Sequence, residues 1–285
     1  MLTLLSKALA KLSLPMIHRL GAGLGWLLHW CTPAARRMML ANLKQSGLCP
    51  NESDLQRVLR ANISETGKAI LETLAIWQWP QQKALSMVKA CHNLHLLDEA
   101  LARGKGIIFL TPHLGCFEIT SVYYATHRPI TVLFRPPKKS WLAPIIDVGR
   151  SKGQVILAPA NAQGVRAILQ ALKRGEAVGI LPDQVPNEGE GEWADFFGKP
   201  AYTMTLASKL AEKTGATVLM VFGERLANGE GYEIHLTPVE SIATPDLLNT
   251  AIAQQIAQKP EQYLWRYHRY KVRRGSIKNE VKTPK

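Results

Sequence analysis

The chain has 285 residues, of which 46% are hydrophobic, and its 35 Lys and Arg against 22 Asp and Glu give a net charge of +13. This length and hydrophobic content exclude a disordered or fibrous protein and predict a globular fold with a large core. The charge predicts an anionic partner, such as a phosphorylated lipid, an anionic membrane face or an acidic carrier protein. No nucleic-acid partner is expected, because the basic residues are scattered among apolar segments and no zinc-finger, RRM or KH motif occurs.

The four cysteines have no CxxC pairing and no regular spacing, so they predict neither a disulfide framework nor a structural zinc site. Cys91, His92 and His95 lie close together in the sequence, but no second pair of ligands follows nearby. We therefore expect no metal and no cofactor.

Residues 1–35 are apolar but interrupted by basic residues, and no stretch reaches the roughly 20 apolar residues that a spanning helix needs. We expect a helical membrane-associating segment that lies in the interface, with Trp26 and Trp30 at the level of the lipid headgroups. The alternative is an ordinary core helix with a kink at Pro15.

Near residue 104 the sequence pattern changes from helical spacing of apolar residues to short runs of β-branched residues. The first hundred residues have helical spacing of apolar residues, as in 51–74, which begins with an Asn/Ser/Asp cluster. Short β-branched runs then predict strands at 106–110, 130–134, 154–158, 177–181, 217–222 and 232–236, and helices are expected at 164–175 and 202–215. The alternation predicts an α/β fold, with a single domain, 36–285, in which helices cover a central mixed sheet.

A histidine and a glutamate follow the first predicted strand in GIIFLTPHLGCFEIT, residues 106–120. Pro112 ends the strand, so His113 lies at its carboxyl end, where open α/β sheets keep their sites. A carboxylate on one imidazole nitrogen raises the basicity of the other, so His113 with Glu118 is a candidate general base that activates a substrate hydroxyl. The alternative is a buried histidine beside an unrelated helix-start glutamate.

Polar residues follow two other predicted strands in the same way. Arg135 in ITVLFRPPKK can bind a phosphate or a carboxylate bidentately, unless it belongs to a solvated basic turn. Asp183 and Gln184 come directly after AVGILP. The long loop that follows ends in FFGKPA, an apolar and basic patch, and loops of this length are usually functional.

Five motifs together resemble the late acyltransferases of bacterial lipid A biosynthesis: TPHLGCFE, LFRPP, LPDQ, FFGKPA and QYLWRYHRYK, in this order over roughly residues 15–275. The resemblance implies an enzyme on the cytoplasmic face of the bacterial inner membrane. Such enzymes transfer a fatty acyl chain from acyl carrier protein to a hydroxyl of a phosphorylated lipid A precursor, and they form an acyloxyacyl group. Where the family often has Asn or Ser and then Trp before the acid of its first motif, this chain has Cys116 and Phe117, which leaves the donor and acceptor preference open.

The family's functional residues fall on named positions of this chain. Its H-x4-D/E motif matches His113 and Glu118, its second-motif arginine matches Arg135, and its Asp-Gln pair matches Asp183 and Gln184. The resemblance thus implies that His113, held by Glu118, deprotonates the lipid hydroxyl.

Further residues are expected to bind the substrates. Arg166 would help Arg135 to hold anionic groups, the loop around Phe196 and Phe197 would hold an acyl chain, and Lys199 is expected among the substrate-binding residues. Three alternatives stay open: an acyltransferase acting on a lysophospholipid or another glycolipid, a thioesterase or esterase that activates water, and a non-catalytic basic protein that binds a membrane or nucleic acid.

Overall fold

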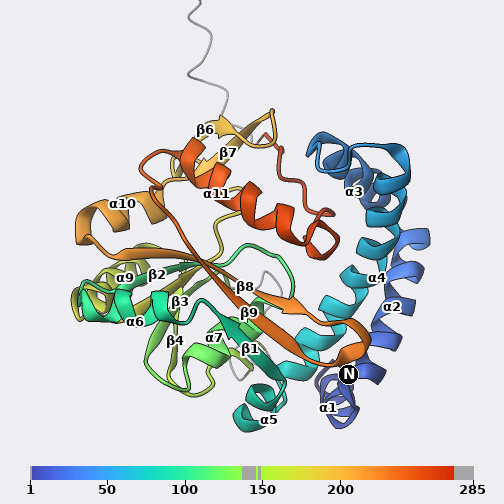
Figure 1. Cartoon of the computed structure of the whole chain (residues 1–285), viewed down its shortest axis with the longest axis horizontal. Helices are drawn as coiled ribbons and strands as arrows, with labels where there is room; N and C mark the ends of the chain where they lie inside the picture. The colour runs from blue at the N-terminus through green and yellow to red at the C-terminus, as the bar shows by residue number, and fades with distance from the viewer. Residues whose placement is uncertain (1, 137–145, 147–148, 273–285) are drawn as a thin grey trace, which may run out of the picture.

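The computed structural model describes residues 2–136, 146 and 149–272 as a twisted sheet with helices on both faces and a layer of N-terminal helices at one side (Figure 1). The main sheet has seven strands in the order β1-β9-β8-β2-β5-β3-β4. The strands are β1 (Val88–His92), β2 (Ile107–Leu110), β3 (Ile130–Phe134), β4 (Val155–Pro159), β5 (Ala177–Ile180), β8 (Thr217–Arg225) and β9 (Tyr232–Pro238). All neighbours pair in parallel except β8 and β9, which pair antiparallel, so the predicted mixed sheet is confirmed.

Helices cover both faces of this sheet because residues along each buried strand alternate between the faces. Ile108 and Leu110 of β2 belong to the core under α9, α10 and α11, whereas Ile107 and Phe109 belong to the core on the side of α6 and α7. The covering helices are α6 (His95–Ala102), α7 (Phe117–Tyr124), α9 (Ala162–Lys173), α10 (Leu206–Thr214) and α11 (Pro245–Gln258).

The N-terminal part is helical, as expected, and packs on the domain. It consists of α1 (Leu2–Lys11), α2 (Leu14–Cys31), α3 (Pro33–Gln45), α4 (Glu52–Ile76) and α5 (Gln81–Ser86), and α2 runs beside α4 in Figure 1. The two helices approach closely at glycines, since a Cβ on Gly25 would lie 2.0 Å from the carbonyl oxygen of Ile63. Pro15 lies in the first turn of α2, where proline is tolerated. A new helix therefore begins here, and the alternative of one helix kinked at Pro15 is wrong.

Buried charges join these helices to the sheet. His18 of α2 and Arg225 of β8 both contact the carboxylate of Glu72 in α4, and the Tyr232 hydroxyl donates to the same carboxylate. Burial alone would raise the pKa of Glu72, but the charge and hydrogen bonds of Arg225 and His18 lower it to about 2. Among the described residues, no helix combines the length and the apolar character needed to cross a membrane.

One predicted boundary is wrong. The helix expected at 202–215 begins only at Leu206, because Pro200–Met204 forms strand β7, which pairs antiparallel with β6 (Gly191–Asp195). The region expected to be a long loop is thus partly a hairpin, and β1 at the edge of the main sheet was also not expected. Two short 3-10 segments, η2 (Ala227–Gly229) and η3 (Pro260–Gln262), complete the described elements.

Candidate active site

His113 and Asp183 meet because the two strands that precede them are neighbours in register. Leu110 of β2 pairs with Ile180 of β5, and His113 and Asp183 each follow three residues later. The pairing continues one residue beyond the strands, since the backbone N–H of Thr111 donates to the carbonyl of Ile180 at 2.9 Å. Two side chains at the same carboxyl edge of adjacent parallel strands are therefore brought into contact.

Asp183 receives two hydrogen bonds from His113. Its Oδ1 lies 2.8 Å from Nδ1 of the ring, and its Oδ2 accepts from the backbone N–H of His113 at 2.9 Å. Because an ionised carboxylate only accepts, the proton of the neutral ring stays on Nδ1 and the lone pair on Nε2. The amide nitrogen of Gln184 lies 3.1 Å from Nε2 and donates to this lone pair.

Asp183 stays ionised although it is enclosed. Its side chain is 3% exposed, and burial would raise the pKa, yet the charge of His113 and the hydrogen bonds from its ring and backbone lower the pKa of Asp183. The hydroxyl of buried Tyr263 also bonds to this carboxylate, and burial with the charge of Asp183 raises the pKa of Tyr263 well above its ordinary value. The imidazole of His113 is thus held in a fixed orientation by an ionised carboxylate.

Glu118 has a different partner from the one expected. Its carboxylate accepts from Nε of Arg150 at 3.0 and 3.1 Å and also pairs with Nη2 of the same arginine. The expected hydrogen bond from Glu118 to His113 is wrong, since Asp183 occupies Nδ1 and the ring of Phe117 stands beside His113 at a centroid distance of 5.0 Å.

The turn between the two residues explains this separation. Gly115 donates to the carbonyl of Gln262, and Cys116 donates to the carbonyl of Gly223, so the backbone is fixed to two other segments before α7 begins. Gly115 has a φ of +59°, and a Cβ there would lie 2.1 Å from the oxygen of Gly223. The predicted glycine turn is confirmed, and it leads Glu118, the second residue of α7, toward Arg150.

A cavity of about 750 Å³ opens at His113, and four basic side chains of the described residues line it. The basic lining residues are Arg135, Arg150, Arg166 and Lys209. Gln184 and one acid, Glu190, also line it, and the remaining wall is largely apolar, with Phe134 and Met204 among its residues. The structure thus brings together five of the residues expected in a site, since His113, Asp183, Gln184, Arg135 and Arg166 lie in or directly behind this cavity.

A second, narrow cavity of about 60 Å³ lies against the α7 side of the sheet. Its wall is mostly apolar and includes Phe109, Val132 and Leu236, and the backbone of Gly179 forms part of it. Glu118 and Arg150 line this cavity, and Arg150 also lines the cavity of His113. The Glu118–Arg150 pair therefore stands where the basic cavity and the narrow apolar cavity approach each other.

The hairpin residues expected around an acyl chain lie elsewhere. Phe196 is only 2% exposed, and its ring packs against Phe197 and Tyr270. Phe197 also contacts the ring of Trp265, and the ammonium group of Lys199 lies 5.0 Å from the ring centroid of Tyr270. None of the three lines the two cavities described above. Lys138 and Lys139, which follow Arg135 in the sequence, lie outside the described residues.

Arg150 is the residue that sequence reasoning missed. It follows the segment 137–145, and no strand end, spacing or motif in the chain points to it. The contact of Asp183 with His113 could have been predicted in part from the sequence, because each residue lies three positions beyond the end of an apolar strand. The prediction also needs the order of the strands in the sheet, which the sequence alone does not give.

The sequence profile of bacterial lipid A biosynthesis acyltransferases matches residues 2–272, nearly the whole chain. The chain belongs to this family. The family resemblance predicted from the five motifs is therefore confirmed, and this lipid A acyltransferase family member is similar in sequence to proteins of several bacteria.

Two relatives are from Escherichia coli (strain K12). A lipid A biosynthesis lauroyltransferase is 24% identical over 274 residues, which cover 92% of this chain and 88% of that protein. A lipid A biosynthesis palmitoleoyltransferase is 27% identical over 273 residues, which cover 92% of this chain and 87% of that protein. A phosphatidylinositol mannoside acyltransferase of Mycobacterium tuberculosis is 25% identical over a shorter stretch of 179 residues, 60% of this chain and 56% of that protein. Family membership supports secondary acylation in lipid A synthesis.

Proposed function

We propose that this protein transfers a fatty acyl chain from acyl carrier protein to a hydroxyl of a lipid A precursor, with His113 as the general base. The observation that carries this proposal is the orientation of the imidazole, whose Nδ1 is held by buried Asp183 and whose Nε2 lies at a cavity with a basic lining. A hydroxyl has a pKa far above neutrality, so its attack on a thioester needs a base at the reacting oxygen.

The steps follow from the lone pair on Nε2. The acceptor hydroxyl takes the place of the Gln184 amide at Nε2 of His113, which lies 3.1 Å from that amide in the free enzyme. Nε2 then accepts the hydroxyl proton while the oxygen attacks the thioester carbonyl carbon. Asp183 stabilises the imidazolium without taking the proton. The carbon–sulfur bond breaks, the sulfur leaves with the proton from Nε2, and an acyloxyacyl ester remains.

The cationic lining suits the charges of both substrates. Arg135, Arg166 and Lys209 come from three different segments and line one cavity, so they can hold the phosphate groups of a lipid A precursor or of the donor's prosthetic group. Arg150 and the Gln184 amide supply donors for the oxyanion of the tetrahedral intermediate.

The Glu118–Arg150 pair has a positioning role in this proposal. Glu118 fixes the guanidinium of Arg150 with its charge-assisted bonds, so Arg150 stays at the cavity of His113 when that cavity is empty of substrate. The narrow apolar cavity on the other side of this pair is the place we assign to the acyl chain, because its wall offers hydrocarbon and ring surface to methylene groups.

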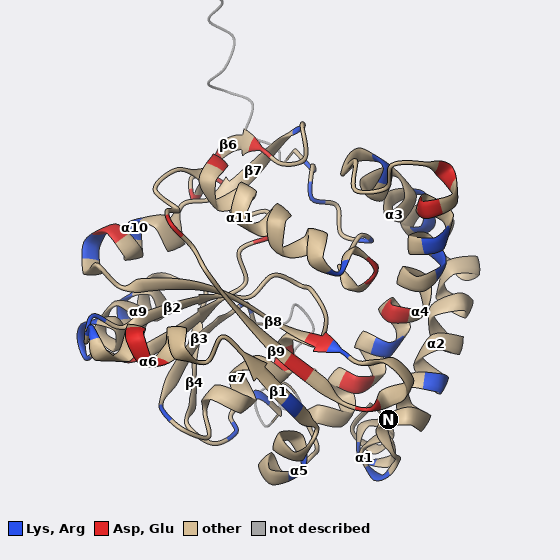
Figure 2. Ribbon diagram, viewed as in Figure 1, with Lys and Arg blue, Asp and Glu red and all other residues tan. Residues whose placement is uncertain are grey.

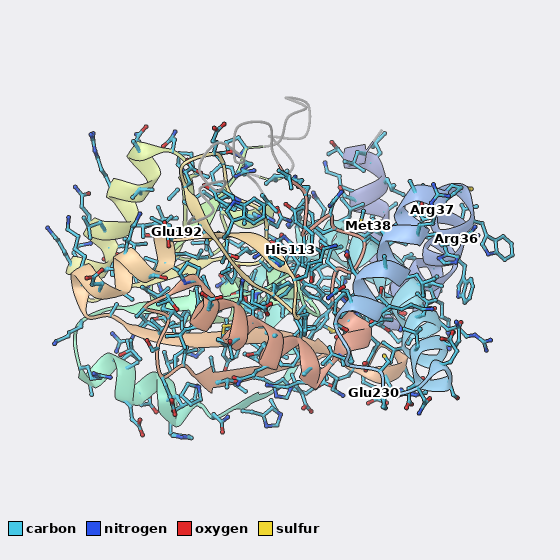
Figure 3. The ribbon with its side chains drawn as sticks, turned by 90° about the horizontal axis from the view of Figure 1, so that it is seen from above. Arg36, Arg37, Met38, His113, Glu192 and Glu230 are labelled. Atoms are coloured by element: carbon cyan, nitrogen blue, oxygen red, sulfur yellow. The ribbon has the colours of Figure 1, made fainter. Side chains whose placement is uncertain are left out.

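The N-terminal helices supply a surface for the cytoplasmic face of the inner membrane. Apolar side chains that are 37–73% exposed gather on α1 and α2: Leu4, Leu5, Met16, Leu20, Trp26, Leu27 and Trp30. Exposed Arg36 and Arg37 at the start of α3 lie at the outer side of the helical layer, while His113 lies in the interior (Figure 3). Apolar and basic residues together bind an anionic lipid surface.

The test is a reconstituted reaction. The purified protein is incubated with a ladder of acyl carrier protein thioesters and a tetra-acylated lipid A precursor, and mass spectrometry reads the products. One added acyl chain, lost in His113→Ala, supports the proposal. Acylation of a lysophospholipid in preference to the lipid A precursor, or release of free fatty acid at the same rate without any acceptor, would refute it.

A further inference from the structure

Two histidines and a glutamate gather on one face of the sheet, away from the cavity of His113. His92 at the end of β1 pairs in parallel register with His235 of β9, so the two side chains are directly opposite on neighbouring strands. Glu233 lies two residues before His235 and therefore points to the same face. None of the three lines the cavity of His113.

The two histidine rings stack on each other and on a phenylalanine. The rings of His92 and His235 stack at a centroid distance of 4.6 Å, and His235 stacks in turn on buried Phe222 of β8 at 4.7 Å. Nε2 of His92 lies 2.8 Å from the Glu233 carboxylate, and one ligand atom from each of His92, Glu233 and His235 lies within 4.8 Å of the others. The three donor groups are therefore close together, although the two stacked rings must turn before both can face one ion.

A further carboxylate, that of Glu224, lies beside His235 on the side away from His92 and Glu233 in the hydrogen-bond network. Nε2 of His235 lies 2.9 Å from the carboxylate of Glu224, whose other oxygen pairs with Lys259 at 2.6 Å. A second carboxylate behind a ligating histidine is the common way to fix its tautomer.

We propose that His92, His235 and Glu233 form a binding site for one divalent transition-metal ion of the Zn²⁺ class. Two imidazoles and one carboxylate are a set that zinc accepts, with water in the fourth position. Two ligands of a tetrahedral zinc ion stand roughly 3.3 Å apart. The side chains are 46%, 22% and 30% exposed in this order, so the exposed His92 side chain can turn to close the set from its present spacing.

The bound ion would cross-link two neighbouring strands, β1 and β9. Within the described part of the chain β1 is an edge strand that pairs with β9 alone. The three ligands come from these two strands, so the ion would fix the edge of the sheet to the β8–β9 hairpin. The sequence pairing of Cys91, His92 and His95 did not reveal this site. Cys91 points to the opposite face, where it lines the narrow apolar cavity, and the two other ligands come from a strand more than a hundred residues later.

The test uses the full chain without a histidine tag, which would itself bind zinc. After treatment with a chelator the protein is titrated with ZnCl₂ by calorimetry, and the stoichiometry is read by native mass spectrometry. We expect one ion per chain and a melting temperature that rises by a few degrees, about 5 °C, at saturating zinc. His92→Ala and His235→Ala should each weaken binding by more than about 10-fold.

The controls separate this site from adventitious binding. His127→Ala removes an exposed histidine outside the cluster, and Cys31→Ser removes an exposed thiol, so both should bind zinc like the unchanged protein. If His235→Ala fails to fold, the exposed His92→Ala and Glu233→Gln decide. Absence of binding, or zinc affinity unchanged within about 3-fold in the ligand variants, would overturn the proposal.

Discussion

Asp183→Asn is the change that most directly tests how the base is oriented. Asp183 accepts two hydrogen bonds from His113, one from the ring at 2.8 Å and one from the backbone N–H at 2.9 Å. An asparagine offers one acceptor oxygen and one NH₂ group in the same place. If its oxygen faces the backbone N–H, its NH₂ faces Nδ1, which must then carry the lone pair, so the proton moves to Nε2 and blocks the base.

The magnitude follows from the alternatives open to the asparagine. Keeping the productive tautomer would set the NH₂ group against the buried backbone N–H of His113, which costs about 1–3 kcal/mol for the unpaired donor. Loss of the ionised carboxylate removes a charge-assisted bond to the imidazolium, worth about 1.5–3 kcal/mol. Together these give a fall in kcat/KM of roughly 10²- to 10⁴-fold.

The assay is acyl transfer to the lipid A precursor at saturating donor, with the melting temperature measured in parallel. Asp183→Asn should fold, because the replacement has the same size and keeps the contact with Tyr263. A variant that stays within about 3-fold of the unchanged enzyme would refute the reasoning, and so would an equal or larger loss in Glu118→Gln.

Four further predictions follow. Glu118→Gln frees Arg150 from its carboxylate and should lower kcat/KM by about 10- to 100-fold, less than Asp183→Asn, in the same assay. Arg166→Ala should raise KM for the phosphorylated acceptor by roughly 10-fold with kcat within about 3-fold, and added salt should shrink the difference. Gly179→Leu should fill the narrow cavity and shift preference in a thioester ladder to shorter chains. Burial would raise the pKa of Glu72, but its buried cationic partners lower it to about 2. The ionised Glu72 therefore stabilises the fold by about 3 kcal/mol above pH ~4.3, and this stabilisation is lost as the pH falls toward 2. Glu72→Gln should have a lower melting temperature at pH 7 and a melting temperature that falls less steeply with acid.

The sequence was enough to predict much of the sheet. Six strands were expected from β-branched runs, and all are present, because buried parallel strands need continuous apolar residues. β1, with its sequence VKACH, lacks such a run, so an edge strand that depends on pairing with β9 was not visible. Tyr202 and Thr203 sit in a window with helical spacing, but pairing with the β6 strand decides their conformation.

The sequence was enough to predict which residues lie at the site but not which of them contact each other. His113, Asp183 and Gln184 were placed at strand ends by local pattern alone. Which carboxylate holds the imidazole depends on strand order, since β2 lies next to β5 only after two segments far apart in the chain have paired. Glu118 was the nearer acid in sequence and Asp183 is the nearer one in space.

The charge of the whole chain also divides in space. Lys and Arg are found at the outer ends of α9 and α10 and along α3 and α4, with acidic residues between them (Figure 2). The net charge of +13 predicted an anionic partner, and part of that charge lies at the cavity of His113, where four of the described cations line the wall and where we propose that anionic groups bind.

The register of β2 on β5 has a consequence for how the enzyme comes into being. The pairing of β2 with β5 brings His113 and Asp183 together, so in a chain whose central strands have not yet paired, the imidazole that we propose as the base lacks its carboxylate partner. The rate at which acyl transfer returns after dilution from denaturant would thus report the rate at which β2 and β5 pair. A partly folded chain in which these strands are unpaired could not modify lipid.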